Sequence, residues 1–514
     1  MPGSEITALL DFLLRICPDA IKIVWDLENF ASPILKMLNL DICRQIAGPT
    51  HEATFSDGSD VDYSIFYLEG ILFSIRKKQG GISRRKVTFY GLNGFFDDDV
   101  SEPTCVFQLK EMACKLLGEL EKIGISPKKL TSPIGSFLSA CRLPSLPTIL
   151  DTPDQFMEAQ LYAEQCDGRE WREALSIGHW SDDECYSYDI SCAYGSEAAR
   201  LPDLRYAQYI HSKEMIDSAY FGFLRGTVTI NDNVRCSPIM ARLDGRLVNP
   251  TGTWNTFLTL DEVRFIQRWE IGNFRMIDGW FLRFKHTEFP LRELIENLYL
   301  QRSRSDRILN TFLKRVPSGI VGKFHEHRDD GLGDLFNPIY HAVITSNIRL
   351  KVANLIYENN AQNNILRINT DGLITDKPLW IARRPGIGKW RQVESQASII
   401  LSPELVFQGG KHPNGLTYPR LRSLICRHPK SALYADRRIK KRVSLFEAIR
   451  DHELAKLGEM TTRSGRIDLT LLAQSQIRNF PKFPRTGEQL IENKYDSTPI
   501  RLGNNSRNST LVKL

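Results

Sequence analysis

The 514-residue chain is too long for one hydrophobic core, and its length predicts three or four domains. Hydrophobic residues make up 42% and charged residues 25% of the chain, which excludes a largely disordered protein. The net charge of +6 suits a polyanionic partner but does not demonstrate one.

The cysteines and the apolar segments exclude further classes. The ten cysteines include no Cys-x-x-Cys pair, so neither a zinc site nor a disulfide framework is indicated. No run of 18 apolar residues occurs, and Glu5, Asp11 and Asp19 interrupt the first 21 residues. We therefore expect a soluble intracellular protein that is neither secreted nor inserted in a membrane.

The first predicted strand, Ile21–Trp25, leads to Asp26 and Glu28. Carboxylates at positions i and i+2 of a strand point to the same face, where both could share a metal ion. A second strand, Lys86–Tyr90, and a helix at Cys105–Ile123 complete the pattern of an α/β domain.

The proline-rich segment 142–147 predicts a domain boundary near residue 150. The next clear strand is Tyr186–Ile190, which carries Asp189 near its end and runs into a turn of small residues. Short alternating runs between 220 and 260, such as Gly226–Ile230, predict more sheet.

A basic helix is predicted over Pro290–Val316, with Arg302, Arg307 and Lys314 among its cations. The segment Pro317–Phe324 follows it, and its two glycines would let the backbone approach a ligand closely. The basic helix and the glycine-bearing segment together would suit the binding of a triphosphate.

A predicted helix over Thr345–Glu358 precedes a hairpin. Its strands, Ile365–Ile368 and Leu373–Thr375, flank a turn that contains Asp371. If this hairpin lies beside the strand of Asp189, the two carboxylates meet at one sheet edge. A pair of carboxylates there could hold two divalent cations roughly 3.5–4 Å apart, as in-line attack on a phosphate requires.

The carboxy-terminal part predicts a strand over Ser398–Phe407, interrupted by a proline, and a turn at Gly386–Trp390. The densest charge cluster, 437–442, is interpreted as a surface that contacts nucleic-acid phosphates, with a sorting signal as the alternative. Residues 503–509 have the composition of a flexible end.

Four of these segments, taken in order, resemble the motifs of family B DNA polymerases, and among them the small protein-primed type of phages and organellar plasmids. Asp189–Gly195 is similar to the first palm motif at Asp189 and Tyr194, and Lys314–Lys323 to the fingers motif. Thr345–Arg349 resembles the template-contacting motif, and Asn369–Asp371 the second palm motif.

The chain departs from the family's pattern at several positions. Ser318, Gly319 and Val321 replace the usual Asn, Ser and Tyr, and Asn369 stands where the family has a second Asp. Fifty-seven residues separate Lys314 from Asp371, which leaves little room for the strand-displacing insertion of protein-primed members. The resemblance thus implies poor unaided strand displacement.

The resemblance implies a DNA-directed DNA polymerase, a nucleotidyltransferase that adds deoxynucleotides to a primer. Asp189 and Asp371 would be catalytic and would hold two Mg²⁺ or Mn²⁺ ions together with the backbone carbonyl of Ile190. The nucleotide-binding residues would be Tyr194, Arg302, Lys314 and Ser318. The DNA-binding residues would be Lys323, Thr345, Arg349, Arg437, Arg438, Lys440 and Lys441.

Partners implied by the resemblance are primer-template DNA, dNTPs and a terminal or other accessory replication protein. The compartment would be the bacterial cytoplasm for a phage-encoded protein, or else an organelle. Priming mode, template preference, host and oligomeric state stay open.

In the same family a ribonuclease-H-like proofreading exonuclease domain precedes the polymerase. Asp26 and Glu28 resemble its first motif, and Asn93 and Asp97 its second. The third motif, Tyr-x-x-x-Asp, has one candidate, Tyr162 with Asp167, whose spacing is one residue longer than that of the motif. On a helix the extra residue turns Asp167 by about 100° from the expected face. Proofreading is therefore not expected.

The fold class is therefore a multidomain α/β and α+β protein, a right-hand polymerase preceded by an exonuclease-type domain. The predicted domains are the exonuclease-like domain at 1–170, the palm at 171–290 and 331–410, the fingers at 291–330, the thumb at 411–500 and a flexible tail at 501–514.

Two other functions compete with this interpretation. One is a polymerase-like protein that binds nucleic acid without catalysis, as the departures at Asn369, Ser318 and Val321 indicate. The other is a nuclease acting through residues 20–100. For the nuclease, Trp25–Phe30 also resembles the opening of NYN-type ribonucleases, which would need acids such as Asp97, Asp151 and Asp154.

Overall fold

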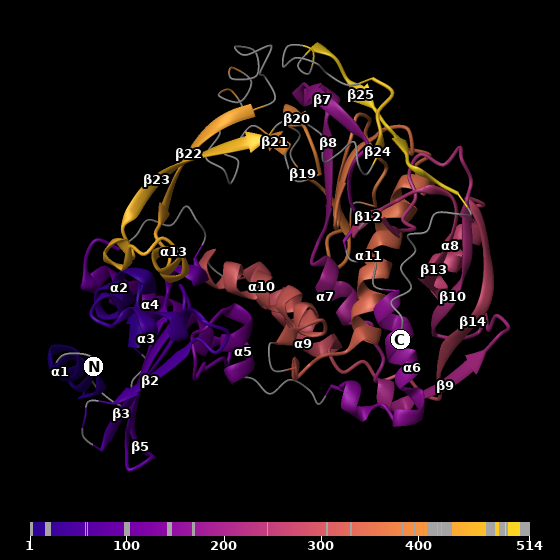
Figure 1. Cartoon of the computed structure of the whole chain (residues 1–514). Coiled ribbons are helices and arrows are strands. Elements are labelled where there is room, and N and C mark those ends of the chain that lie inside the picture. Colours follow the sequence, from indigo (N-terminus) through magenta and orange to yellow (C-terminus); the bar gives the residue numbers. More distant parts are fainter. Residues whose placement is uncertain are drawn as a thin grey trace. The chain divides into compact units, whose positions relative to one another are not determined.

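A computed structural model provides the structure of the chain (Figure 1). It describes residues 4–15, 22–56, 58, 60–96, 103–140, 146–166, 170–243, 245–304, 307–328, 331–382, 384–393, 396–403, 406–408, 419, 423, 434–468, 478–482, 489 and 492–503. The chain forms two compact units, each described by itself. The first comprises Met1–Pro144, Asn297–Ile320 and Arg438–Ser464, and the second comprises Ser145–Glu296, Val321–Arg437 and Gly465–Leu514.

The first unit is built on a five-stranded sheet with the order β1-β5-β4-β3-β2. Its strands are β1 (Lys22–Val24), β2 (Glu52–Ser56), β3 (Val61–Leu68), β4 (Leu72–Gln79) and β5 (Ile82–Gly91). β1 runs parallel to β5, and the other neighbours are antiparallel. The predicted strands at 21–25 and 86–90 and the α/β character of this region are confirmed.

Helices α1 (Ser4–Arg15), α2 (Leu27–Lys36) and α3 (Leu40–Ala47) contribute apolar side chains to the core of this unit. Leu10, Leu35, Phe73 and Ile75 are buried in it. Val443 belongs to the same core, next to helix α13 (Leu445–Arg450), although it lies some 350 residues along the chain from β5. A late segment of the chain therefore completes the amino-terminal core.

Helices α4 (Val106–Lys122) and α5 (Pro133–Ala140) follow the sheet, and α4 confirms the helix predicted at 105–123. The basic helix predicted at 290–316 is instead two helices, α9 (Arg292–Arg304) and α10 (Arg307–Lys323). The sequence interpretation placed Arg302 and Lys314 on one helix. In the structure they lie on two different helices.

The glycine-bearing segment predicted to approach a ligand is helical, because α10 continues through Pro317 to Lys323. Buried Val316 and Ile320 extend the apolar stripe of the helix past the proline. A Cβ atom at Gly319 would lie 2.7 Å from the Cβ of Ile134 in α5. Gly319 thus permits close helix packing within the first unit.

The second unit contains a large antiparallel sheet, extended at one edge by a short parallel strand, with the order β27-β13-β10-β14-β9. Its strands are β9 (Ala207–Ser212), β10 (Phe221–Ile230), β13 (Thr251–Thr259), β14 (Gly272–Phe284) and β27 (Arg501–Leu502). β10 contains the predicted strand at 226–230. Since Leu502 is buried in β27, the predicted flexible tail does not begin at residue 501.

Two further sheets of this unit surround the candidate site. The first has the order β19-β8-β18-β17-β6, with β6 (Arg172–Ala174), β8 (Tyr186–Ile190), β17 (Ile365–Asn369), β18 (Gly372–Thr375) and β19 (Trp390–Val393). The second has the order β21-β20-β7-β25, with β7 (Ser176–Trp180), β20 (Ser398–Ile400), β21 (Val406–Gln408) and β25 (Tyr495–Asp496). The predicted hairpin and turn are confirmed. The predicted strand at 398–407 is instead two strands, β20 and β21, which pair antiparallel with each other.

Four two-stranded elements are also described. They are β11 (Ala241–Leu243) with β12 (Arg246–Val248), β15 (His327–Arg328) with β16 (Gly331–Leu332), β22 (Tyr434–Arg442) with β23 (Met460–Asp468), and β24 (Arg478–Asn479) with β26 (Thr498–Pro499). Short helical turns lie at Asn93–Phe95, Ile149–Asp151, Asp154–Phe156, Asp182–Glu184, Leu204–Tyr206 and Leu454–Lys456.

The long helix α11 (Pro338–Glu358) lies against α6 (Met157–Gln165), α7 (Ala193–Ala198) and α8 (Leu260–Arg268) (Figure 1). Asn337 caps its first turn by accepting a hydrogen bond from the Tyr340 amide, and Pro338 occupies the first helical position, where no amide is needed. α11 begins seven residues before the predicted helix. Among the described residues, no helix is long and apolar enough to span a membrane.

The compact units do not follow the predicted domain limits. The first unit ends at Pro144, close to the proline-rich boundary, and α6 belongs to the second unit. The predicted exonuclease-like domain extends to residue 170. In the structure, buried Ala159 and Ala163 of α6 pack in the second unit, where α6 contacts α11.

A buried ion pair ties the carboxy-terminal segment to the second unit. Arg478 Nη1 lies 2.9 Å from Glu173 Oε1, and the two side chains are 0% and 3% exposed. Arg478 also donates to Ser497 Oγ and to the carbonyl of Arg235, while Trp171 donates to Glu173. The pair is therefore well satisfied by hydrogen bonds.

Replacing Arg478 with Met should lower the free energy of unfolding by about 3–5 kcal/mol, because Glu173 would remain buried and unpaired. Urea titration followed by tryptophan fluorescence measures the change. Lys494→Met is the control, since it breaks a pair with Glu184 in which both side chains are nearly half exposed and should cost less than about 1 kcal/mol. Equal small losses for both variants would contradict the prediction.

Candidate active site

The pairing of β8 with β18 brings the two predicted catalytic aspartates together. Asp189 lies in β8 directly opposite Gly372, the first residue of β18, and Asp371 immediately precedes Gly372. The Ile190 amide donates to the Asp371 carbonyl at 3.1 Å, so the turn is held against the end of β8. The carbonyl of Ile190, predicted as a metal ligand, therefore also belongs to this sheet edge.

The turn between β17 and β18 consists of Thr370 and Asp371. Thr370 has a φ of +61°, a left-handed conformation that lets two residues reverse the chain. Its amide donates to the carbonyl of Trp171 at 2.8 Å, which fixes the turn to the segment that leads into β6. The position of the Asp371 backbone is thus defined from two sides.

Negative charge accumulates around Asp371. Burial, and after it the charges of Asp189 and Glu170, raise the pKa of Asp371 to about 6. Repulsion between neighbouring carboxylates is the condition that a bound cation relieves.

Arg391 is the counter-ion of Asp189. β19 lies beside β8 with Arg391 opposite Asp189, and its Nη2 and Nε atoms lie 2.5 and 3.1 Å from Asp189 Oδ2. Arg391 also lowers the pKa of Asp371, although less than burial raises it. Sequence reasoning missed Arg391, because only the strand order of the sheet places it opposite Asp189.

Glu170 is a third carboxylate that the sequence did not single out. The Tyr194 hydroxyl donates to Glu170 Oε1 at 3.0 Å, and Glu170 also pairs with Arg172. Burial, followed by the charge of Glu170, raises the pKa of the Tyr194 hydroxyl. Glu170 and Arg172 also line a cavity of about 360 Å³ with Met240, Leu247 and Asn249.

The residue types at this edge fit a hard divalent cation. Mg²⁺ is commonly bound through one or two carboxylates, with water or substrate phosphates completing its coordination. Asp189 and Asp371 supply two carboxylates, and Glu170 lies within electrostatic reach of Asp371. In the described part of the chain, however, no three His, Cys, Asp or Glu side chains form a group that could hold a metal by themselves.

The predicted nucleotide-binding residues of the fingers lie in the first unit. Lys314 and Ser318 are exposed on α10 one helical turn apart, so they share a face. Arg302 lies on α9 and its Nε donates to Asn310 Oδ1 at 3.3 Å. No geometry relates these residues to Asp189 and Asp371, because the two units are described separately.

The structure corrects the predicted DNA contacts of α11. Arg349 is 1% exposed, and its Nη2 lies 2.8 Å from Glu262 Oε1 in α8. Thr345 is also buried and its hydroxyl donates to the carbonyl of His341. These side chains hold α11 and α8 together, and a buried paired arginine has no free surface for a phosphate.

Other predicted DNA-binding lysines have partners within the protein. Lys323 pairs with Glu326, and Lys441 Nζ lies 3.3 Å from Glu447 Oε1. The Lys441 side chain is 57% exposed, which leaves it accessible to a phosphate. The side chains of Arg437, Arg438 and Lys440 lie outside the described residues.

In the first unit, Asp26 and Glu28 do not lie on a strand. Asp26 caps α2 by accepting from the Asn29 amide at 3.1 Å, and Glu28 lies in the first turn of that helix. Asp26 Oδ2 also lies 3.0 Å from Arg442 Nε. Burial, and secondarily Asp26, raise the pKa of Glu28.

Of the other exonuclease candidates, Asn93 lies near Asp26, because its amide donates to the Trp25 carbonyl at 3.2 Å. Tyr162 belongs to the second unit, where its hydroxyl donates to Asp278 at 3.0 Å. Asp97 and Asp167 lie outside the described residues. The structure therefore groups Asp26, Glu28 and Asn93 but gives Tyr162 a partner in another sheet.

Comparison with known proteins identifies the fold. No protein-family model matches the chain, and no curated protein sequence matches it. Phi29 DNA polymerase in complex with primer-template DNA and incoming nucleotides aligns with a TM-score of 0.57, over 91% of this chain and 93% of that chain. The chain has the fold of Phi29 DNA polymerase.

A second solved structure supports this assignment. Phi29 DNA polymerase with primer-template DNA alone aligns with a TM-score of 0.54 over 90% of this chain. Sequence identity in these two alignments is 11% and 12%, so the likeness concerns the fold. The predicted resemblance to protein-primed family B polymerases and the predicted fold class are confirmed.

Replacing Asp371 with Asn should stabilise the metal-free protein increasingly as the pH rises. Because the folded pKa of about 6 exceeds the ordinary value of 3.8, the folded protein binds this proton more tightly than the unfolded chain does. Ionisation between pH 4 and pH 7 therefore opposes folding. The stability difference between Asp371→Asn and wild type should grow by about 1–3 kcal/mol between pH 4 and pH 8.

Urea titrations in EDTA at both pH values measure this difference. Asp217→Asn is the matched control, because Asp217 is exposed and its stability difference should not change with pH. A pH-independent difference for Asp371→Asn would show that Asp371 titrates normally in the folded protein.

Proposed function

We propose that this protein is a template-directed DNA polymerase that adds deoxynucleotides to a primer 3′-hydroxyl. The observation that carries the proposal is the convergence of Asp189 and Asp371 at one sheet edge, in a chain with the Phi29 polymerase fold. The solved Phi29 structures include complexes with primer-template DNA and incoming nucleotides. We extend those partners, DNA and dNTPs, to this chain.

Asp189 and Asp371 would hold the two Mg²⁺ or Mn²⁺ ions of the reaction. When bound, such ions lower the pKa of the primer hydroxyl and neutralise charge on the transferred phosphate. The elevated pKa of Asp371 supports this role, because the site without a cation concentrates negative charge. Arg391 would compete with a metal ion for the charge of Asp189, since it donates to Oδ2 of this carboxylate.

Tyr194 would lie under the deoxyribose of the incoming nucleotide and exclude a 2′-hydroxyl. Its hydroxyl is held by Glu170, so the ring has a fixed orientation. Lys314 and Arg302 would bind the β- and γ-phosphates, with Ser318 beside Lys314 on the exposed face of α10. A terminal or other accessory protein as partner, and poor unaided strand displacement, remain part of this proposal.

A second candidate function is nucleic-acid binding without catalysis. The ion pair between Arg391 and Asp189 favours it, because a tethered cation already neutralises the first carboxylate. Asn369 also removes a charge that the family's motif supplies. Primer extension distinguishes the two functions.

Purified protein with Mg²⁺ or Mn²⁺ should extend a labelled primer on a DNA template. Asp189→Asn and Asp371→Asn should each reduce the rate by more than about 100-fold, since even residues that only orient metal ligands cost 10–100-fold. The assay with and without a primer, using deoxy- and ribonucleotides in parallel, also reports the priming mode and the sugar preference.

Asp217→Asn serves as the control, because this exposed carboxylate lies outside the site. Its extension rate should equal that of the wild type. Absence of extension with either metal, together with retained binding of primer-template DNA, would favour the binding-only function.

No degradation of a labelled single strand is expected from residues 20–100. Asp26 is engaged by a helix cap and by Arg442, and the Tyr162 hydroxyl is bound to Asp278. Gel analysis of a 3′-labelled and a 5′-labelled strand with Mg²⁺ or Mn²⁺ tests this. Degradation that persists in Asp371→Asn but disappears in Asp26→Ala would establish a nuclease in the first unit instead.

A further inference from the structure

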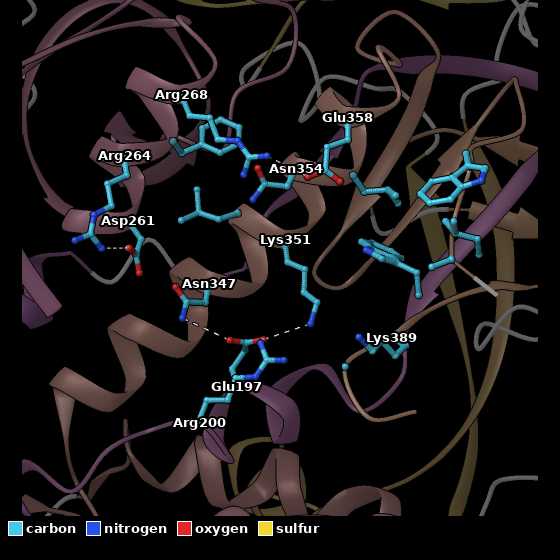
Figure 2. Close-up of a pocket in the computed structure, with 18 residues that line it drawn as sticks. Glu197, Arg200, Asp261, Arg264, Arg268, Asn347, Lys351, Asn354, Glu358 and Lys389 are labelled. Carbon is cyan, nitrogen blue, oxygen red and sulfur yellow. Dashed lines mark hydrogen bonds and ion pairs between the residues drawn. The ribbon is translucent and has the colours of Figure 1, made fainter. Parts of the chain in front are cut away.

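The second unit contains a cavity of about 640 Å³ that neither Asp189 nor Asp371 lines (Figure 2). It lies among α8, α11, the end of α7 and the residues 380–382 and 388–390. Its volume falls within the range of small-molecule sites, about 300–1,000 Å³. Cavities of this size with convergent polar groups are candidates for ligand binding.

Positive charge dominates the lining. The cations are Arg200, Arg264, Arg268, Lys351 and Lys389, and the carboxylates are Glu197, Asp261 and Glu358. The two cations of α8 have carboxylate partners, since Arg264 Nη1 lies 2.7 Å from Asp261 and Arg268 Nη2 lies 3.5 Å from Glu358. The excess charge is therefore at the other end of the cavity.

There three cations, Arg200, Lys351 and Lys389, face one carboxylate, Glu197 (Figure 2). Glu197 Oε1 lies 3.4 Å from Lys351 Nζ and 3.6 Å from Arg200 Nη1. Strong charge-assisted hydrogen bonds measure about 2.7–2.9 Å. Glu197 is therefore shared loosely between two cations and fully neutralises neither.

The third cation, Lys389, is exposed, and no carboxylate of the described residues forms an ion pair with it. Lys351 is more enclosed, with 23% of its side chain exposed. Burial lowers the pKa of Lys351 and the charges of Arg200 and Lys389 lower it too, while Glu197 opposes them. Arg200, Lys351, Lys389 and Glu197 together therefore carry a net positive charge.

The backbone holds these cations in place. Gly388 has a φ of +69°, and a Cβ atom there would lie 2.7 Å from the Cβ of Ser196 and 3.1 Å from Lys351 Nζ. Only glycine allows the chain to pass this close to α7 and Lys351. Ser191 fixes the same segment by accepting from the Gly388 amide and donating to the Lys389 carbonyl.

An aromatic side chain marks the rim. Trp380 is 79% exposed, although its backbone is held by two hydrogen bonds with the side chain of Asn359. Trp390 also lines the cavity. An exposed indole on a fixed backbone offers a flat surface on which a base can stack.

We propose that this cavity is a second nucleotide site, which binds a nucleoside polyphosphate with its phosphates at Arg200, Lys351 and Lys389 and its base against Trp380. Phosphate oxygens supply the negative charge that Glu197 does not, and the amides of Asn347 and Asn354 offer hydrogen bonds along the lining. The site does not depend on the polymerase function, because it shares no residue with the proposed catalytic groups.

Calorimetric titration of the full-length protein in EDTA, without DNA, tests the proposal with ATP and with pyrophosphate as probes. Both should bind, and ATP should bind more tightly. Arg200→Gln combined with Lys389→Gln should weaken both by about tenfold or more, because two charge-assisted contacts are lost. Trp380→Ala should remove the advantage of ATP and leave pyrophosphate unaffected.

One control separates this site from other cations. Lys213→Gln removes an exposed charge elsewhere in the second unit. It should not change the binding measured in EDTA. No binding by the wild type, or equal affinity for the wild type and the Arg200 and Lys389 double variant, would overturn the proposal. Equal affinity of wild type for ATP and pyrophosphate would overturn the assignment of the base to Trp380.

Discussion

The pairing of β8 with β18 is the constraint on which the candidate chemistry depends. Opposite strands of an antiparallel sheet place side chains about 5 Å apart, so the register decides which residues meet. With Gly372 opposite Asp189, the turn residue Asp371 comes to the end of β8, some 180 residues away in sequence. A register shift of one residue would direct the Asp189 side chain to the other face of the sheet. Buried Ile368 of β17 and buried Leu373 and Ile374 of β18 favour that register, because a shift would move them out of their buried positions.

Charge balance distinguishes two sites of the second unit. At the sheet edge, three carboxylates lie near one another with Arg391 and Arg172 as their counter-ions, and Asp371 is protonated more readily than usual. In the cavity beside α7, three cations lie near one carboxylate, Glu197, which pairs with two of them. The helix α7 separates the two environments, since it begins just after Asp189 and ends near Glu197 and Arg200. One short helix thus lies between a group with excess negative charge and a group with excess positive charge.

The sequence predicted the parts of the fold that depend on local pattern. The strand of Asp189 and the hairpin of Asp371 follow from alternation and turn chemistry, and the order of the motifs indicated the polymerase fold. Predictions that needed tertiary information were wrong. Arg349 matched a DNA-contacting motif, but its burial against Glu262 depends on how α8 packs on α11. Likewise, Arg391 and Glu170 acquire their positions from the strand order β19-β8-β18-β17-β6, which no local pattern encodes.

The ion pair of Arg391 with Asp189 would make metal binding at the proposed site a competition. Both contacts of Arg391 are made to Oδ2 of Asp189, so an arriving divalent ion would meet a carboxylate whose charge is already partly neutralised. Its measured affinity would be the difference between two attractions for the same carboxylate, and a weaker Arg391 interaction would appear as tighter metal binding. If the ion displaced the guanidinium, that group would remain attached to β19, close to the ion. A positive group released there is available to an anion that arrives with the metal, such as a phosphate.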